Sequence, residues 1–295
     1  GYNIYSMKKY VDKKRIIFTT IIVILIIITL GFIIYYSVDT TIRLKNAKRF
    51  EQKLIEYESK QEELQKQERE RQAKIPKLTD EGKQNIKGIY KSETKRVFLT
   101  FDDGPSVNTA DVLDILKSND IKATFFVLGT QVEKMPEMVK RAYQEGHYIA
   151  NHGYSHQYSQ IYSSPETVLQ EFNQCNSAVA KAIDVPEYNS HLFRFPGGSV
   201  GGKYANLKAE AVTLLEQNNI MHVDWNALTG DAEKSSPDEE YLMNNLQKTT
   251  QNKNSIVILM HDAQAKRVTV DFLPKLIEFF QQQGYQFENF YSIIK

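Results

Sequence analysis

The first long hydrophobic pattern in this chain is a run of apolar residues that has no period. Residues 16–36 are almost wholly apolar and carry no charge, and a helix of that length can cross about 30 Å of hydrocarbon. The core of a signal peptide is shorter, at about 7–15 residues, and no small-x-small cleavage site follows the run. We therefore expect an uncleaved transmembrane anchor at 16–36, in preference to a cleaved signal or a buried soluble helix.

Basic residues flank this apolar run on both sides. Those before it are Lys8, Lys9, Lys13, Lys14 and Arg15. They favour a cytoplasmic N-terminal segment at 1–15, with the rest of the chain outside the cell. Further basic residues at 43–49 weaken this asymmetry of charge.

Charged and amide side chains dominate residues 41–73, where neither Gly nor Pro occurs. This composition predicts a solvated helical stalk over 37–76, ended by Pro76. Leu54, Tyr57 and Leu64 recur too sparsely for a strong heptad seam. A charged spacer is therefore favoured over a dimerisation element, and weak self-association through the stalk stays open.

The pattern changes again after a linker expected at 77–95, where a globular domain begins that we assign to 96–295. Short apolar runs rich in β-branched and aromatic residues predict strands at 97–101, 123–128, 148–150, 192–194, 220–224 and 256–260. Helical patterns lie between them, at 109–118, from Ser164-Pro165, from Ser236-Pro237 and at 272–283. Repeated β-then-α order predicts an α/β fold with a parallel sheet covered by helices, and the number of strands is compatible with a closed or distorted barrel.

The amino-acid composition argues against nucleic-acid binding and against a disulfide-stabilised fold. Lys and Arg total 37 and Asp and Glu total 36, for a net charge of +1 with both signs interspersed. Because a nucleic-acid partner needs a basic surface, we expect none. The single cysteine, Cys175, excludes an intramolecular disulfide, and its spacing from Phe172 and Val179 predicts a buried helix residue.

Polar side chains follow the ends of the predicted strands. They are Asp102 and Asp103, Asn151 and His152, Arg194, Trp225, and His261 and Asp262. Because the carboxyl ends of parallel strands carry the active site in such folds, we expect these side chains to share one site.

Two of these patterns can be interpreted either as part of a catalytic or metal site or as ordinary structural features. His152 and His156 form an H-x3-H pair, which beside a carboxylate from another strand end would offer two imidazoles and one aspartate to a divalent ion. Such pairs also occur without a metal. Asp102 and Asp103, before Gly104-Pro105, are equally compatible with a turn.

Five motifs stand in order along the predicted domain. They are Thr100-Phe101-Asp102-Asp103-Gly104-Pro105, Asn151-His152-Gly153-Tyr154-Ser155-His156, Arg194-Phe195-Pro196-Gly197-Gly198, Asp224-Trp225 and Ile258-Leu259-Met260-His261-Asp262. Together they resemble the signatures of carbohydrate esterase family 4, the polysaccharide deacetylases, from about residue 96 to the C-terminus. The resemblance implies a deformed (β/α) barrel and hydrolysis of N-acetyl groups on glycans.

The resemblance also implies a base and a metal site. Asp102 matches the family's catalytic base, and Arg194 matches the arginine that braces it. Asp103, His152 and His156 match the ligands of one divalent metal ion. We expect zinc, with cobalt, manganese or nickel as alternatives.

The remaining motifs imply an acid and a pocket. His261 matches the general acid of the family. In many members an aspartate a few residues after a tryptophan orients this histidine, and counting from Trp225 places that role on Asp231, with Asp224 as the rival. Trp225 and Leu259 are expected to form an apolar pocket for the acetyl methyl group.

The sequence departs from the family pattern at two positions. Gly153 stands where Ser or Thr often follows the first histidine, so a hydroxyl that could rigidify the loop is lost. Gly197 stands where the third motif often has tyrosine, which removes an aromatic wall. The backbone N–H of Gly197 can still help to hold an oxyanion.

The substrate expectation follows from the anchor and stalk, which would hold the domain outside the membrane. We expect a single-pass protein of the cell membrane that deacetylates peptidoglycan amino sugars, with N-acetylglucosamine and N-acetylmuramic acid both open. The alternatives are O-acetyl ester hydrolysis, as on xylan, and deacetylation of chitooligosaccharides. Outside enzymes, a catalytically silent glycan-binding module and a membrane scaffold remain.

Overall fold

The computed structural model describes residues 2–294 of the chain, with side chains at Met7 and from Lys13 to Ile294. The side chains of Lys8 and Lys9, which contribute to the predicted orientation, lie outside this description. The chain divides into two compact units that meet between residues 69 and 70, and each is described by itself.

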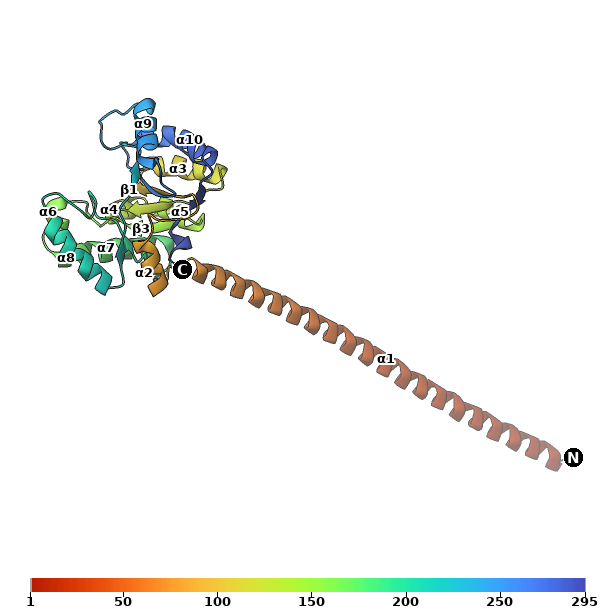
Figure 1. The fold of residues 1–295 in the computed structure, drawn as a ribbon. Coiled ribbons are helices and arrows are strands. Elements are labelled where there is room, and N and C mark those ends of the chain that lie inside the picture. The colour runs from red at the N-terminus through yellow and green to blue at the C-terminus, as the bar shows by residue number, and fades with distance from the viewer. Residues whose placement is uncertain (1, 295) are drawn as a thin grey trace. The chain divides into compact units, whose positions relative to one another are not determined.

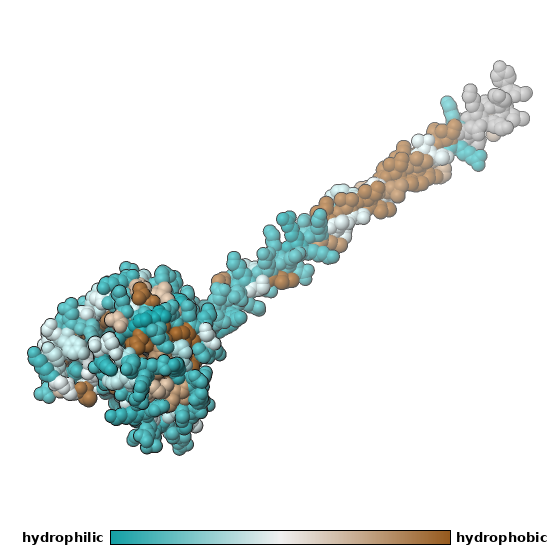
Figure 2. Space-filling model, turned by 90° about the horizontal axis from the view of Figure 1, so that it is seen from above, coloured by the Kyte–Doolittle hydropathy of each residue, from teal (hydrophilic) through white to brown (hydrophobic). Residues whose placement is uncertain are grey.

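The described residues of the N-terminal unit form one helix, α1 (Tyr2–Ala73), whose last turn belongs to the C-terminal unit. Its most apolar 18-residue window has a mean hydropathy of 3.1, and none of that window is buried, so α1 is long and apolar enough to cross a membrane by length and composition. Figure 2 shows this stretch as a hydrophobic band on the helix, next to a hydrophilic stretch. The hydroxyls of Thr19, Thr20 and Thr29 donate to backbone carbonyls four residues earlier, so the helix satisfies its own polar groups there.

Residues 77–95, which the sequence indicated as a linker, carry a helix. This is α2 (Asp80–Lys87), and the Thr79 hydroxyl caps it by accepting from the N–H of Gly82 at 3.1 Å. Ile86 and Ile89 are buried in a core cluster with Phe98 of the first strand. The segment is therefore folded onto the domain and is not a free connector.

One parallel sheet forms the centre of the C-terminal unit (Figure 1). Within the described residues its eight strands are β1 (Arg96–Asp102), β2 (Thr124–Val127), β3 (Tyr148–Asn151), β4 (Leu192–Phe193), β5 (Met221–His222), β6 (Ala227–Leu228), β7 (Ser255–His261) and β8 (Gln286–Glu288). They lie in the order β5-β4-β3-β2-β1-β7-β6, and β8 pairs with the first half of β1. The curled sheet is an incompletely closed (β/α) barrel, so the predicted fold class is confirmed.

The helices cover the sheet and connect its strands. They are α3 (Val107–Ser118), α4 (Gly129–Lys134), α5 (Pro136–Gln144), α6 (Tyr158–Ile161), α7 (Pro165–Ile183), α8 (Ala205–Gln217), α9 (Glu239–Thr250), α10 (Arg267–Gln282) and the 3-10 turn η1 (Phe290–Ser292). Helix α7 begins as predicted, because the Ser164 hydroxyl accepts from Thr167 N–H. Helix α9 begins later than the predicted Ser236-Pro237 start, because the carboxylate of Asp238 caps it.

Both faces of the sheet are buried, which is why its strands are apolar along their whole length. The outer face packs under the helices around Phe101 and Phe125. The inner face, with Phe98 and Phe126, is closed by α2 and by Phe290 of η1. Cys175 is buried on α7 as predicted, and burial raises the pKa of its thiol. These layers leave the carboxyl ends of the strands as the place for polar side chains.

Candidate active site

The parallel register of the sheet brings the predicted site residues together. Asp102 of β1 is the register partner of His261 of β7, and Asn151 of β3 is the partner of Phe193 of β4, so the residues that follow them emerge at one edge. A cavity of about 360 Å³ lies there. The predicted residues that line it are Asp102, Asp103, His152, His156, Gly197, Trp225, Asp231, Leu259 and His261.

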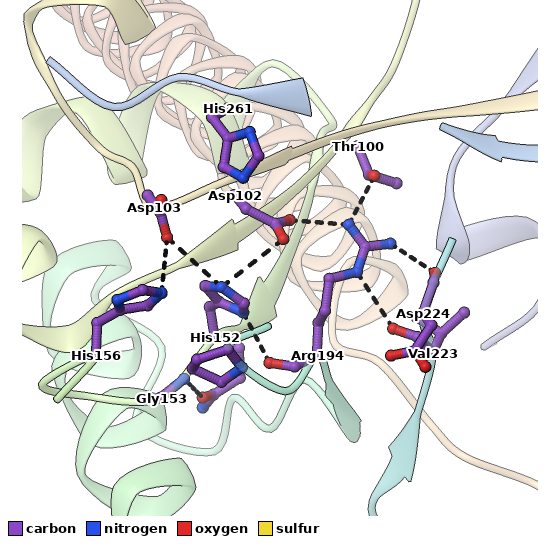
Figure 3. Close-up of polar contacts among 12 residues, drawn as sticks. Thr100, Asp102, Asp103, His152, Gly153, His156, Arg194, Val223, Asp224 and His261 are labelled. Carbon is purple, nitrogen blue, oxygen red and sulfur yellow. Dashed lines mark hydrogen bonds and ion pairs between the residues drawn. The ribbon is translucent and has the colours of Figure 1, made fainter. Parts of the chain in front are cut away.

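Three side chains offer ligand atoms to one point in this cavity (Figure 3). Asp103 Oδ1 lies 3.4 Å from His156 Nε2 and 3.5 Å from His152 Nε2. The three ligand atoms lie within 4.8 Å of one another. Asp103 Oδ1 is also buried with no hydrogen-bond partner among the described residues. A buried carboxylate oxygen without a donor, facing two imidazole nitrogens, fits a divalent ion.

The protonation state of His152 suits a metal ligand. Its Nδ1 lies 2.7 Å from the carbonyl oxygen of Arg194, which places the proton on Nδ1 and leaves the Nε2 lone pair toward Asp103. Burial lowers the pKa of His152 to about 3. The imidazole is therefore neutral over the physiological range, as ligation requires.

Asp102 is held by a fully buried arginine. Nη1 of Arg194 donates to Asp102 Oδ1 at 2.8 Å and to the Thr100 hydroxyl at 2.8 Å. Asp102 Oδ2 points the other way, 3.7 Å from His152 Nε2. Burial raises the pKa of Asp102, and the Arg194 charge opposes this. One oxygen of Asp102 is therefore fixed, and the other faces the metal ligands as a proton acceptor.

His261 lies on the other side of the cavity and is paired with Asp231. Asp231 Oδ1 lies 3.0 Å from His261 Nδ1, and Oδ2 accepts from the backbone N–H of His261 at 2.7 Å and from the Thr269 hydroxyl at 2.7 Å. Burial lowers the pKa of His261, but the hydrogen bond and charge of Asp231 outweigh it and raise the pKa to about 9. The imidazole is therefore protonated at neutral pH.

Asp224, the rival candidate for this pairing, has other partners. Its carboxylate accepts from the backbone N–H and the hydroxyl of Ser199, at 2.9 and 2.5 Å. Its carbonyl oxygen accepts from Nη2 of Arg194 at 3.0 Å. Asp224 thus holds the turn after Gly198, and Asp231 is the carboxylate next to His261.

Comparison with known proteins identifies the family of this chain. Residues 90–214 match the family model described as polysaccharide deacetylase. The peptidoglycan-N-acetylglucosamine deacetylase of Bacillus cereus is 33% identical over 205 residues, which span 68% of this chain and 71% of that protein. This chain belongs to the polysaccharide deacetylase family.

Two further relatives agree with this membership. YheN of Bacillus subtilis is 36% identical over 198 residues, which cover 65% of this chain and 66% of YheN. The structure of a carbohydrate esterase family 4 esterase from Streptococcus mutans has a TM-score of 0.64 and 30% identity, and the match covers 70% of this chain and 90% of that one. The predictions of the family and of a deacetylase of the hydrolase class are confirmed.

The first departure of this deacetylase from the family pattern has a structural reason. Gly153 has a φ of +89°, and a β-carbon there would lie 3.1 Å from Ile161 Cδ1 and 3.4 Å from Glu171 Oε2. A larger residue would therefore meet both strain and crowding. The loop that carries His152 and His156 needs its glycine and must be held by other groups.

Glu171 of α7 holds this loop, and the sequence analysis missed it. Its buried carboxylate accepts from the backbone N–H groups of Tyr154 and Ser155, at 2.6 and 2.7 Å, and from the Ser155 hydroxyl at 2.7 Å. One sequence signal could have found it, because Glu171 lies on the apolar stripe of α7 that contains Val168 and Cys175. A carboxylate on an apolar stripe indicates buried hydrogen-bond donors.

We expect Glu171→Gln to weaken metal binding by about 10- to 100-fold. The variant keeps the size of the side chain but loses its negative charge. The amide oxygen can still accept from both loop N–H groups, which share Oε2 of Glu171, but a neutral acceptor forms weaker hydrogen bonds, so His156 is held less firmly. Titration of the purified protein with zinc measures the change. Glu166→Gln, an exposed change on the same helix, serves as the control. Unchanged zinc affinity in Glu171→Gln would contradict the role of Glu171.

Proposed function

We propose that this chain is a membrane-anchored enzyme that hydrolyses N-acetyl groups of extracellular peptidoglycan amino sugars and releases acetate. The observation that carries the proposal is that a metal-ligand set, a proton acceptor and a proton donor line one cavity. Asp102 is the acceptor and His261 is the donor. A silent binding module would not need all three.

The substrate class is supported by the relatives and by the anchor. The Bacillus cereus relative is named as a peptidoglycan-N-acetylglucosamine deacetylase, so N-acetylglucosamine is the sugar that we propose. The alternative is O-acetyl ester hydrolysis, which the esterase from Streptococcus mutans favours. Acetate release from acetylxylan, measured beside peptidoglycan, separates the two.

The proposed mechanism begins at the metal ligands. When bound by Asp103, His152 and His156, a divalent ion, zinc in our proposal, supplies Lewis-acid polarisation of the acetyl carbonyl and a lower pKa for water. Asp102 Oδ2 accepts the proton of the attacking water, while Arg194 holds Oδ1 and keeps the carboxylate oriented.

The remaining residues stabilise the charge and complete the reaction. The backbone N–H of Gly197 donates to the oxyanion that develops on the acetyl group. His261, kept protonated by Asp231, gives its proton to the leaving nitrogen, so that acetate and a free amino sugar result. Trp225 and Leu259 line the cavity and accommodate the acetyl methyl group.

We expect acetate release from purified peptidoglycan by the full-length protein in detergent to stop when the metal is chelated. Adding back zinc, cobalt, manganese or nickel should restore it, and the ion that restores it best identifies the metal. Asp103→Asn should bind no metal and stay inactive in all four, because one of the three ligands loses its charge. Full activity after the metal content has fallen to background would contradict the metal site.

We also propose that residues 16–36 span the membrane once, with the deacetylase domain outside. The exposed apolar surface of α1 and the basic residues at 13–15 support this orientation. The helical part of the stalk, residues 37–73, would span about 55 Å. That is enough to hold a domain away from the lipid surface and near a polymer.

We expect protease added to intact cells to digest the domain while the membrane-embedded segment survives. Deletion of 16–36 should move the protein from the membrane pellet to the soluble fraction, because no other apolar span remains among the described residues. A cytoplasmic marker protein serves as the control for cell integrity. Protection of the domain in intact cells would reverse the proposed orientation.

A further inference from the structure

The space beside Gly197 is occupied by an aromatic side chain from a distant part of the chain. Gly197 has a φ of +74°, and a β-carbon built there would lie 2.6 Å from Tyr158 Oη and 3.3 Å from Tyr158 Cζ. A side chain at 197 and the tyrosine at 158 therefore exclude each other. The aromatic wall that this sequence lacks at 197 is replaced by a ring from α6.

Tyr158 lines the same cavity as the candidate catalytic residues. Its ring centroid lies 5.6 Å from that of His156, and 42% of the residue is exposed. Among the described residues we find no hydrogen-bond partner for its hydroxyl. The cavity wall thus contains a phenol hydroxyl that is available to hydrogen-bond with a ligand.

The position of Tyr158 is set by packing against the turn that carries Gly197. The Tyr162 hydroxyl donates to the carbonyl oxygen of Pro196 at 2.7 Å, and the Tyr162 ring centroid lies 5.6 Å from that of Tyr158. This hydrogen bond joins the end of α6 to the 194–198 turn. A ring held in this way loses little freedom when a ligand binds.

We propose that Tyr158 contacts the sugar whose acetyl group is removed. Its ring forms the wall of the sugar subsite beside the metal ligands, and its hydroxyl donates to a hydroxyl oxygen of that sugar. Aromatic rings offer an apolar face to the C–H groups of a pyranose, and a phenol adds a directional hydrogen bond. The inference rests on the proposed glycan-deacetylase function and names a residue that determines its specificity.

The test uses the full-length, metal-loaded protein and soluble glycan fragments of peptidoglycan. In Tyr158→Phe we expect KM to rise about 3- to 10-fold, as for one hydrogen bond, with kcat within about 2-fold of the wild type. Tyr158→Ala, which also removes the wall, should raise KM further. Tyr154→Phe, in the loop before α6, is the matched control, because the Tyr154 hydroxyl bonds to Glu133 and Tyr154 does not line the cavity.

A second measurement tests the steric relation between the two positions. Gly197→Ala should reduce kcat/KM more in the wild-type background than in Tyr158→Ala, because the added methyl group meets the Tyr158 ring only when the ring is present. Equal losses in both backgrounds would overturn the mutual exclusion on which the inference rests.

Binding of the fragments to the Asp102→Asn protein, measured by calorimetry, keeps the inference separate from the proposed function. If this protein binds fragments and Tyr158→Ala weakens that binding, Tyr158 is a glycan contact even where no acetate is released. Unchanged Kd and KM in both Tyr158 variants, with metal still bound, would overturn the inference about Tyr158 and leave the proposed deacetylase function intact. So would a fall in kcat at constant KM in Tyr158→Phe, since that places the hydroxyl on the reacting atoms.

Discussion

Asp102→Asn should lower kcat for acetate release by about 10²- to 10⁴-fold and leave the metal content of the protein unchanged. The asparagine oxygen can still accept from Arg194, as Asp102 Oδ1 does at 2.8 Å. The amide group at the Oδ2 position can no longer take a proton from water. The loss should therefore appear in kcat and not in metal binding. Steady-state kinetics and metal analysis of the same preparation measure both.

The neighbouring carboxylate provides the matched control for this prediction. Asp103→Asn changes the same chemical group one residue along, but it should abolish metal binding, because Asp103 Oδ1 faces both histidines. Loss of metal in Asp102→Asn would contradict the division of roles and make Asp102 a ligand. Because Arg194 is fully buried and loses its counter-charge, circular dichroism must establish that Asp102→Asn is folded.

Asp231→Asn should move the alkaline limb of the pH dependence of kcat/KM to lower pH. Asp231 raises the pKa of His261 to about 9 against the opposing effect of burial. The active acid is the protonated form, so activity falls as pH rises through that pKa. Without the charge and hydrogen bond of Asp231, burial is opposed only by the more distant charges of Asp102 and Asp103, so the pKa of His261 should fall. At neutral pH we expect a loss of about 10²-fold, with a smaller loss near pH 5.5.

Profiles of kcat/KM against pH, with metal content checked at each point, measure this shift. Asp224→Asn is the control, because Asp224 bonds to Ser199 and not to His261, and it should leave the alkaline limb in place. An equal shift in both variants would assign the effect to general electrostatics. No shift in Asp231→Asn would contradict the pairing of Asp231 with His261.

Much of the fold and the candidate site could be predicted because buried parallel strands are recognisable as short apolar runs in the sequence. Strands such as β1 and β7 consist mostly of buried apolar residues, and each ends in a polar residue, Asp102 or His261. Since all the pairings are parallel, their carboxyl ends meet at one edge. The candidate ligand set of Asp103, His152 and His156 came from the resemblance to the family motifs, and the structure brings the three side chains together.

Short or half-exposed elements could not be predicted in this way. β6 has two residues and β8 has three, and neither lies in a longer apolar run such as the one at 220–224 that predicted β5. Helix α2 contributes buried isoleucines to the inner face of the sheet. That role depends on where the inner face lies, and the sequence around residues 77–95 contains no sign of it.

The sequence by itself determined the α/β fold and the apolar N-terminal helix, and its motifs supplied the candidates for the metal ligands, the base and the acid. Only the tertiary structure decided which groups support them. Asp231 and not Asp224 meets His261 because the chain after β6 returns beside β7. Glu171 reaches the histidine loop from α7, and Tyr158 fills the space at Gly197. These contacts join residues far apart in the chain, and packing sets their distances, which no local pattern encodes.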